Sequence, residues 1–503
     1  MRRDLQRRRV LRRRIVLRRQ GRAEPIERGQ PRLSAGTLSQ HRRDQYRAVR
    51  VTPGARGNPV ITKQQAKQII DAVVAASKAD EVHCDVSAGE TTHLRYARNA
   101  PSTSGNAADL TVSVTSTFGK RSGSFRVNQT DAASIERAVR ASEEIARLAP
   151  EDPEHMPALG PQPYVDIPHA FRDSVVDRGA EQIAQGVATC IRAAVDAGLV
   201  AAGFATASAE ATAIGNSRGL FGFHRATAAH FSQTVRTPDG TGSGWASDTG
   251  LDAGEIRFAD ASRVAIDKAV RSAKPQPLAP GRYVAILEPA CVANLVSLFV
   301  YGMDARSADE GRSFFSRPGG GNRLGDRLFP DVVSIESNPA DAEVPGRPWG
   351  AEGLPQVRRA WIERGVVSEL ACSRFWAAKT GREPVPPPSN ILMRGGEGTT
   401  ADLVRSTRRG VLITSLWYIR SVDPRTMLYT GLTRDGVFWI ENGEIVRPLT
   451  NFRWNDSPVA VLKNVEAMSA SRRVSPRSWA SNTVSVPALR VSSFELSSVS
   501  DAV

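Results

Sequence analysis

Residues 431–458 read GLTRDGVFWIENGEIVRPLTNFRWNDSP, and this stretch indicates the character of the C-terminal part of the chain. The Asn442-Gly443 pair separates two apolar runs, which is typical of a hairpin with a type I′ turn because both central residues need positive φ. GVLITSLWYIR before it and VPALRVSSFEL after it are further short runs rich in strand-forming residues. Residues 276–503 are therefore predicted to form a mostly-β C-terminal domain.

Residues 56–275 instead mix helix and strand patterns. DLTVSVTSTF (109–118) alternates apolar and polar residues, as a half-buried strand does. Thr62 and Gln65 have the spacing of a capping box, and Asp131 is a candidate N-cap of a second helix that Pro150 closes. The predicted buried residues are Ala66, Ile69, Ile70, Val73 and Val74 in the first helix, and Ile135, Ala138, Val139 and Ile145 in the second.

These patterns predict an α+β protein of several domains, as its 503 residues also suggest. We expect an N-terminal mixed α/β domain over 56–150, a proline-rich linker over 151–171 and a middle α/β domain over 172–275. Proline removes backbone donors and resists helix and sheet interiors, which places the linker. Residues 1–55 form an arginine-rich tail with few residues able to build a core, so we expect it to be disordered.

The positive charge of the chain is concentrated in that tail. Residues 1–50 hold 17 arginines against four acids, a net charge of +13, so the other 453 residues carry only +2 of the total +15. Three explanations stay open: an arm for nucleic acid or an acidic partner, a targeting presequence, or a misplaced translation start. We expect no membrane association, since no apolar stretch is long enough to span a bilayer, and a cytoplasmic location.

Histidine and cysteine offer little for a catalytic centre. None of the seven histidines lies beyond His230, although a hydrolytic zinc site usually takes at least one imidazole. His224 and His230 would be about 20 Å apart in a strand and on different faces of a helix, so they cannot share a metal ion. Cys190 and Cys291 lie in apolar helical stripes, whereas the burial of Cys372 is less clear.

Several motifs, in their order along the chain, resemble the TldD/PmbA family of peptidases. They are RYARNA (95–100), LEPACVANLVSLF (287–299), GGGNRLGDRLF (319–329), MRGGEGTT (393–400), the 431–458 stretch and VPALRVSSFELSSVSDAV (486–503). The resemblance covers roughly residues 60–503. It implies TldD/PmbA-type N-terminal and C-terminal domains and a role in proteolysis.

The resemblance also indicates what this chain lacks. A TldD-type subunit carries HExxxH at the start of a helix, with zinc-binding histidines and a glutamate as general base, and a cysteine ligand nearer the C-terminus. Here the matching positions hold Glu288 or Pro289, then Ala293 or Asn294, and the context of Cys372 does not match the ligand cysteine. We expect structural roles for Glu288 and Pro289, since both residue types suit a helix N-terminus.

The pattern is similar to the TldE (PmbA) type, the subunit without the metal site. The resemblance implies a heterodimeric hydrolase in which this chain binds no cofactor and has no catalytic residue, while a TldD-type partner carries HExxxH and zinc. Its substrates would be unfolded or small modified peptides. Our candidates for peptide contact, by pairing along a strand edge and by aromatic and basic side chains, are Trp417, Tyr418, Arg420 and Arg434.

Two other functions stay open from the sequence. The chain could be a self-sufficient peptidase with a non-standard site, for example one that uses Cys372 as nucleophile. It could also be a drifted module that binds peptides, or nucleic acid through the arginine-rich tail alone.

Overall fold

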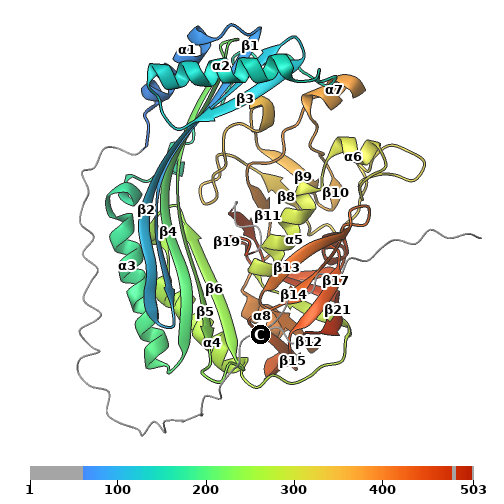
Figure 1. Ribbon diagram of the computed structural model, residues 1–503. Coiled ribbons are helices and arrows are strands. Elements are labelled where there is room, and N and C mark those ends of the chain that lie inside the picture. The colour runs from blue at the N-terminus through green and yellow to red at the C-terminus, as the bar shows by residue number, and fades with distance from the viewer. Residues whose placement is uncertain (1–59, 478–482, 501–503) are drawn as a thin grey trace, which may run out of the picture. The chain divides into compact units, whose positions relative to one another are not determined.

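The computed structural model describes residues 60–477 and 483–500; the predictions for residues 1–55 lie outside these ranges. The described residues combine helices with three β-sheets (Figure 1), which confirms the predicted α+β class. In these ranges, no helix is both long and apolar enough to cross a membrane.

The first sheet is antiparallel and is built from long strands. Among the described residues its order is β3-β2-β1-β4-β5-β6. The strands are β1 (Glu81–Ala97), β2 (Ala100–Phe118), β3 (Arg121–Val127), β4 (Val200–Asn216), β5 (Phe221–Arg236) and β6 (Ser243–Gly250). The DLTVSVTSTF segment lies in β2, as its alternation predicts.

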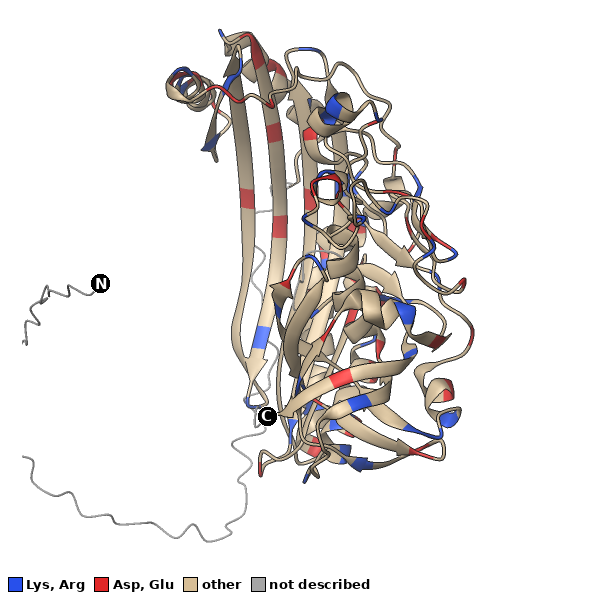
Figure 2. Cartoon of the chain, turned by 90° about the vertical axis from the view of Figure 1, so that its right-hand side faces the viewer, with Lys and Arg blue, Asp and Glu red and all other residues tan. Residues whose placement is uncertain are grey.

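Two pairs of helices cover the apolar face of this sheet. Helices α3 (Asp173–Asp196) and α4 (Phe258–Arg271) bury one core against β4 and β5, and α1 (Lys63–Ala76) and α2 (Ala132–Leu148) bury another against β1 and β2 (Figure 1). Because strand residues alternate between faces, the opposite face carries polar side chains such as His83, Thr206 and His230. Few residues of the long strands are charged (Figure 2).

Strands from the two predicted α/β domains join in this one sheet, because β1 pairs with β4 along nearly its whole length. The proline-rich residues between them contain a 3₁₀ turn (Pro168–Ala170) and cross the surface. The Tyr164 hydroxyl donates to the Gly353 carbonyl oxygen at 2.6 Å, so the segment also contacts the C-terminal residues.

The local helix predictions are largely confirmed. Thr62 and Gln65 form a capping box on α1, and Asp131 caps α2 by accepting from the Ser134 backbone N–H. The predicted burial of Ile145 is wrong, since its side chain is 43% exposed. The buried stripe of α2 continues instead through Ser142 and Ala146, which follow Ile135 at helical spacing.

The C-terminal residues form two further sheets. In the described residues, one has the order β10-β9-β8-β11-β20-β19, and the other β13-β14-β17-β21-β7-β12-β15-β16 with β18 beside β21. The strands are β7 (Gly281–Leu287), β8 (Ile335–Ser337), β9 (Arg359–Glu363), β10 (Val366–Val367), β11 (Ile391–Met393), β12 (Arg409–Ile413), β13 (Leu416–Asp423), β14 (Leu428–Thr433), β15 (Val437–Glu441), β16 (Glu444–Pro448), β17 (Phe452–Asp456), β18 (Val465–Met468), β19 (Arg472–Val474), β20 (Val484–Val486) and β21 (Leu489–Val499).

The Asn442-Gly443 prediction is confirmed. The two residues connect β15 to β16, with φ of 50° at Asn442 and 83° at Gly443, as a type I′ turn requires.

Helix α5 (Pro289–Tyr301) occupies the middle of the C-terminal core. It follows β7 directly, and nearly all of its residues are buried, as expected for a helix that is apolar on every side. Shorter helices surround the sheets: α6 (Ala305–Asp309), α7 (Arg374–Thr380), α8 (Thr400–Arg405), α9 (Pro458–Lys463) and a 3₁₀ turn (Ala351–Gly353). The first turn of α5 is therefore the end of a helix that is buried along almost its whole length.

Candidate functional site

The first turn of α5 holds the residues that the sequence aligns with the zinc motif. Glu288 is the N-cap and Pro289 is the first helical residue, where its missing N–H costs nothing. The Lys268 ammonium from α4 donates to Glu288 Oε2 at 2.6 Å and also lies 3.4 Å from the Trp245 carbonyl oxygen. Both charged side chains are largely shielded, with 11% and 20% of their surfaces exposed, so the carboxylate is held in an ion pair.

The position of the second motif histidine lies in the core. Ala293 and Asn294 are both fully buried, and the Asn294 amide donates to the Ala290 carbonyl oxygen of the preceding turn at 2.9 Å. The described residues contain no group of three or more His, Cys, Asp or Glu side chains that could hold a metal ion.

The cysteines are poor nucleophiles in this structure. Burial raises the pKa of the Cys291 thiol well above its usual value, and the nearby Glu288 charge adds to the effect. Cys372, which the sequence left undecided, is only 4% exposed, and burial also raises its pKa. Because the thiolate is the reactive form, these environments favour packing roles.

The six histidines within the described residues lie on strands and in the proline-rich segment. His224 and His230 are both on β5, and burial lowers their pKa values, to about 4 for His224. His83 and His155 line a cavity of about 740 Å³, where His83 Nε2 lies 3.3 Å from Asp85 Oδ2.

The four candidate peptide contacts separate into two pairs. The Arg434 guanidinium carbon lies 5.9 Å from the centre of the Trp417 ring, and that of Arg420 lies 4.3 Å from the Tyr418 ring. Tyr418 is 54% exposed and has a φ of 54° where the β13–β14 register shifts. The two pairs thus occupy different surroundings, and their contact with peptide stays a prediction.

The Trp417 pair belongs to a cluster beside the α5 N-terminus. The Arg477 guanidinium lies between two rings, 4.8 Å from Trp245 and 5.0 Å from Trp417. It also pairs with the buried Asp435 carboxylate, which accepts from the Ser243 hydroxyl at 2.5 Å. This cluster joins β6 of the first sheet to the C-terminal core.

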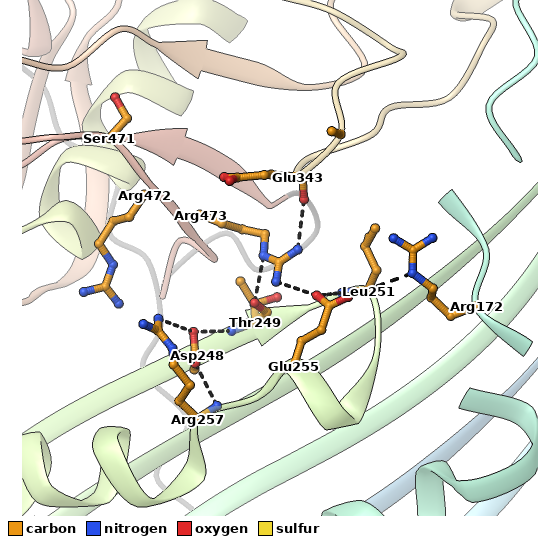
Figure 3. Close-up of a pocket in the computed structure, with 11 residues that line it drawn as sticks. Arg172, Asp248, Thr249, Leu251, Glu255, Arg257, Glu343, Ser471, Arg472 and Arg473 are labelled. Atoms are coloured by element: carbon orange, nitrogen blue, oxygen red, sulfur yellow. Dashed lines mark hydrogen bonds and ion pairs between the residues drawn. The ribbon is translucent and has the colours of Figure 1, made fainter. Parts of the chain in front are cut away.

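Two cavities open along β6. One of about 250 Å³ lies beside Glu288, and one of about 470 Å³ lies farther along the strand (Figure 3). Asp248, Arg257 and Arg472 line both, so the cavities adjoin. Burial raises the pKa of Asp248, but hydrogen bonds and the charge of Arg257 outweigh it and hold that pKa below its usual value.

The sequence patterns did not indicate Lys268 or Arg473 as residues of the site. Lys268 lies on the buried side of α4, one turn from the buried Ala265. A charged residue within an apolar helical stripe is the pattern that could have indicated its role. Arg473 donates to the Thr249 and Glu343 carbonyl oxygens and to Glu255 Oε2, at 2.8, 3.0 and 2.8 Å. Its partners are more than a hundred residues away in sequence, so no local pattern indicates them.

Comparison with known proteins identifies the domain that contains Glu288 and α5. Residues 280–498 match the model of the PmbA/TldA metallopeptidase C-terminal domain. A metalloprotease of Methanothermobacter thermautotrophicus is 25% identical over 230 residues, which are 41% of this chain and 47% of that protein, so the match spans about half of the relative's length. Residues 280–498 are therefore a domain of the PmbA/TldA metallopeptidase kind.

Solved structures show the same fold. TldE from Thermococcus kodakarensis superposes with a TM-score of 0.77 at 17% identity, covering 87% of this chain and 100% of that one. A candidate modulator of a DNA gyrase from Thermotoga maritima superposes with a TM-score of 0.75 at 16% identity, covering 85% and 99%.

Proposed function

We propose that this chain is the non-catalytic, TldE-like subunit of a cytosolic zinc metallopeptidase complex that degrades unfolded or small modified peptides. A TldD-type partner carrying HExxxH would supply the zinc ion and the general base. This chain would supply part of the enclosing wall and a surface that binds the peptide.

The ion pair between Lys268 and Glu288 carries the proposal. A general base in zinc hydrolysis needs a free carboxylate close to the metal-bound water. Glu288 Oε2 instead accepts from Lys268 Nζ at 2.6 Å, and no histidine lies on α5. An ammonium group in this position would also repel a divalent cation. The site therefore favours a role without metal chemistry.

One strand edge favours peptide binding. β6 ends the order of the first sheet and β19 ends that of a C-terminal sheet, and the two strands pack against each other. The unpaired backbone groups of an edge strand can accept an added strand. β6 is buried at every residue except Ser247, so β19, which begins at the exposed Arg472, is the edge that an extended peptide could reach.

The proposal is tested by the zinc content and peptidase activity of the purified chain, alone and co-expressed with a TldD-type protein. We expect zinc and activity only in the co-expressed complex, with the two chains eluting together in size-exclusion chromatography. Zinc at one ion per chain, together with activity of this chain alone, would overturn the proposal.

Two variants sharpen the test. Replacing the first histidine of HExxxH in the partner should abolish activity of the complex, whereas Cys372→Ser in this chain should leave it unchanged. Loss of activity in the Cys372→Ser complex, with folding intact, would favour the self-sufficient cysteine site instead.

A further inference from the structure

The cavity of about 250 Å³ beside Glu288 has an apolar floor. Trp245, Val474 and Pro289 line it, and all are buried. Val264 of α4 completes this floor. Such a surface suits an apolar side chain, because it would bury apolar area without leaving a polar group unpaired.

The rim of the same cavity is charged, and its carboxylates already have cationic partners. Asp248 lies 3.1 Å from Arg257, Asp260 lies 3.5 Å from Arg263, and Glu288 lies 2.6 Å from Lys268. Arg472 is the remaining cation of the rim. Within residues 60–477 and 483–500, its side chain makes no hydrogen bond or ion pair, so the rim has one positive charge in excess.

Arg472 is held where a ligand could reach it. It is exposed and begins β19, where its backbone pairs with Val486. Figure 3 shows its guanidinium extending toward that of Arg257. Arg257 donates to Asp248 through Nε and Nη2, and its Nη1 makes no hydrogen bond to any of the described residues. Two guanidinium groups that approach one another repel, and an anion between them would be attracted by both.

We propose that this cavity binds the C-terminal residue of a peptide. The carboxylate would lie between Arg472 and Arg257, and the terminal side chain would lie on the floor formed by Trp245, Val264 and Val474. The rest of the peptide would pass the exposed start of β19 into the adjoining cavity of about 470 Å³. This inference rests on the proposed role of the chain as a peptide-binding subunit and adds the class of peptide: those with a free carboxylate next to an apolar residue.

Binding to the full chain alone tests the inference. The probes are acetyl-Ala-Ala-Ala-Leu with a free carboxylate and the same peptide as its amide, titrated by calorimetry and by tryptophan fluorescence. We expect the acid to bind roughly tenfold more tightly or better, as paired hydrogen bonds from guanidinium to carboxylate allow. Arg472→Gln should abolish this preference, because it removes the charge from an exposed residue without disturbing a described contact.

Arg126→Gln is the matched control. Arg126 is also exposed on a strand, β3, but lines none of the three cavities, so this variant should keep the preference for the acid. Equal binding of acid and amide by the unaltered protein overturns the inference. A preference for the acid that persists in Arg472→Gln overturns it too. The absence of detectable binding of either peptide also overturns it.

A third probe separates the two sources of a carboxylate. Acetyl-Ala-Glu-Ala-amide carries its carboxylate on a side chain, and we expect it to bind as weakly as the leucine amide. Binding as tight as that of the acid, lost in Arg472→Gln, would assign the site to acidic side chains and overturn the C-terminal assignment. Because no partner or activity enters these titrations, their outcome is independent of whether the chain joins a TldD-type subunit.

Discussion

Lys268 and Glu288 are mutually dependent because each would be a shielded charge without the other. Lys268→Met keeps the length of the side chain but leaves the Glu288 carboxylate, 20% exposed, without its cation. We expect this variant to lose about 2–4 kcal/mol of unfolding free energy, since breaking a shielded ion pair leaves an uncompensated charge. Denaturant unfolding followed by circular dichroism measures the loss.

A double-mutant cycle separates the pair from the packing. Lys268→Met combined with Glu288→Gln should be more stable than Lys268→Met alone, since it removes both charges. Lys67→Met is the control, because Lys67 and Asp71 form an exposed pair at 48% and 58% exposure, and such pairs contribute about 0.5 kcal/mol or less. Equal losses in Lys268→Met and Lys67→Met would contradict the view that Lys268 neutralises the site.

The sequence predicts the roles of residues whose contacts lie close to them in the chain. The caps Thr62 and Asp131 and the helix start at Pro289 depend on contacts within a few residues, and the structure contains them. Lys268 contacts Glu288 across a 20-residue separation, from one helix to the start of another. That contact depends on how α4 and α5 pack, which periodicity does not determine.

At the scale of elements, the turn of the β15–β16 hairpin requires a glycine at position 443. Gly443 has a φ of 83°, and a Cβ there would lie 2.6 Å from the Arg405 carbonyl oxygen. We expect Gly443→Ala to lower stability by about 2 kcal/mol, because it adds backbone strain to a steric clash. The shift in thermal midpoint measures this cost.

Gly281→Ala provides the comparison. A Cβ at Gly281 would meet nothing closer than 3.6 Å, and its φ does not lie in the positive range. This variant should therefore change stability by roughly 0.5 kcal/mol or less. A Gly443→Ala protein as stable as Gly281→Ala would mean that the turn relaxes without cost.

Elements also show where pattern reading fails. The alternation of 109–118 predicts a strand but not its neighbours, and the proline-rich segment suggests a boundary between two separate units. β1 and β4 nevertheless pair across more than a hundred residues, because both have a long polar face and a long apolar face in matching register. Distant strands pair when their apolar faces and their polar faces match. The pattern of one strand alone does not show which other strand it matches.

At the scale of the whole molecule, a few side chains connect the first sheet to the C-terminal sheets. Arg473 on β19 is one of them, with hydrogen bonds to Thr249 on β6 and to Glu255 near it, and a third to Glu343 of the C-terminal part. Its side chain is 19% exposed, so these contacts are partly shielded from water. Hydrogen bonds from a charged donor are stronger than neutral ones and resist separation of the sheets.

Arg473→Met should weaken this connection and leave each sheet intact. We expect a loss of about 2–3 kcal/mol, since two carbonyl oxygens and one carboxylate lose a charged donor. Arg358→Met is the control, because Arg358 is 61% exposed and bonds only to Glu336 among the described residues, so its loss should be small. Unfolding is followed by far-ultraviolet circular dichroism and by the fluorescence of the eight tryptophans, which include Trp245 and Trp417 beside the Arg477 guanidinium. If the two unfolding transitions coincide in the unaltered protein and separate in Arg473→Met, Arg473 couples the sheets. If they coincide and do not shift in either variant, the coupling belongs to the Arg477 cluster instead.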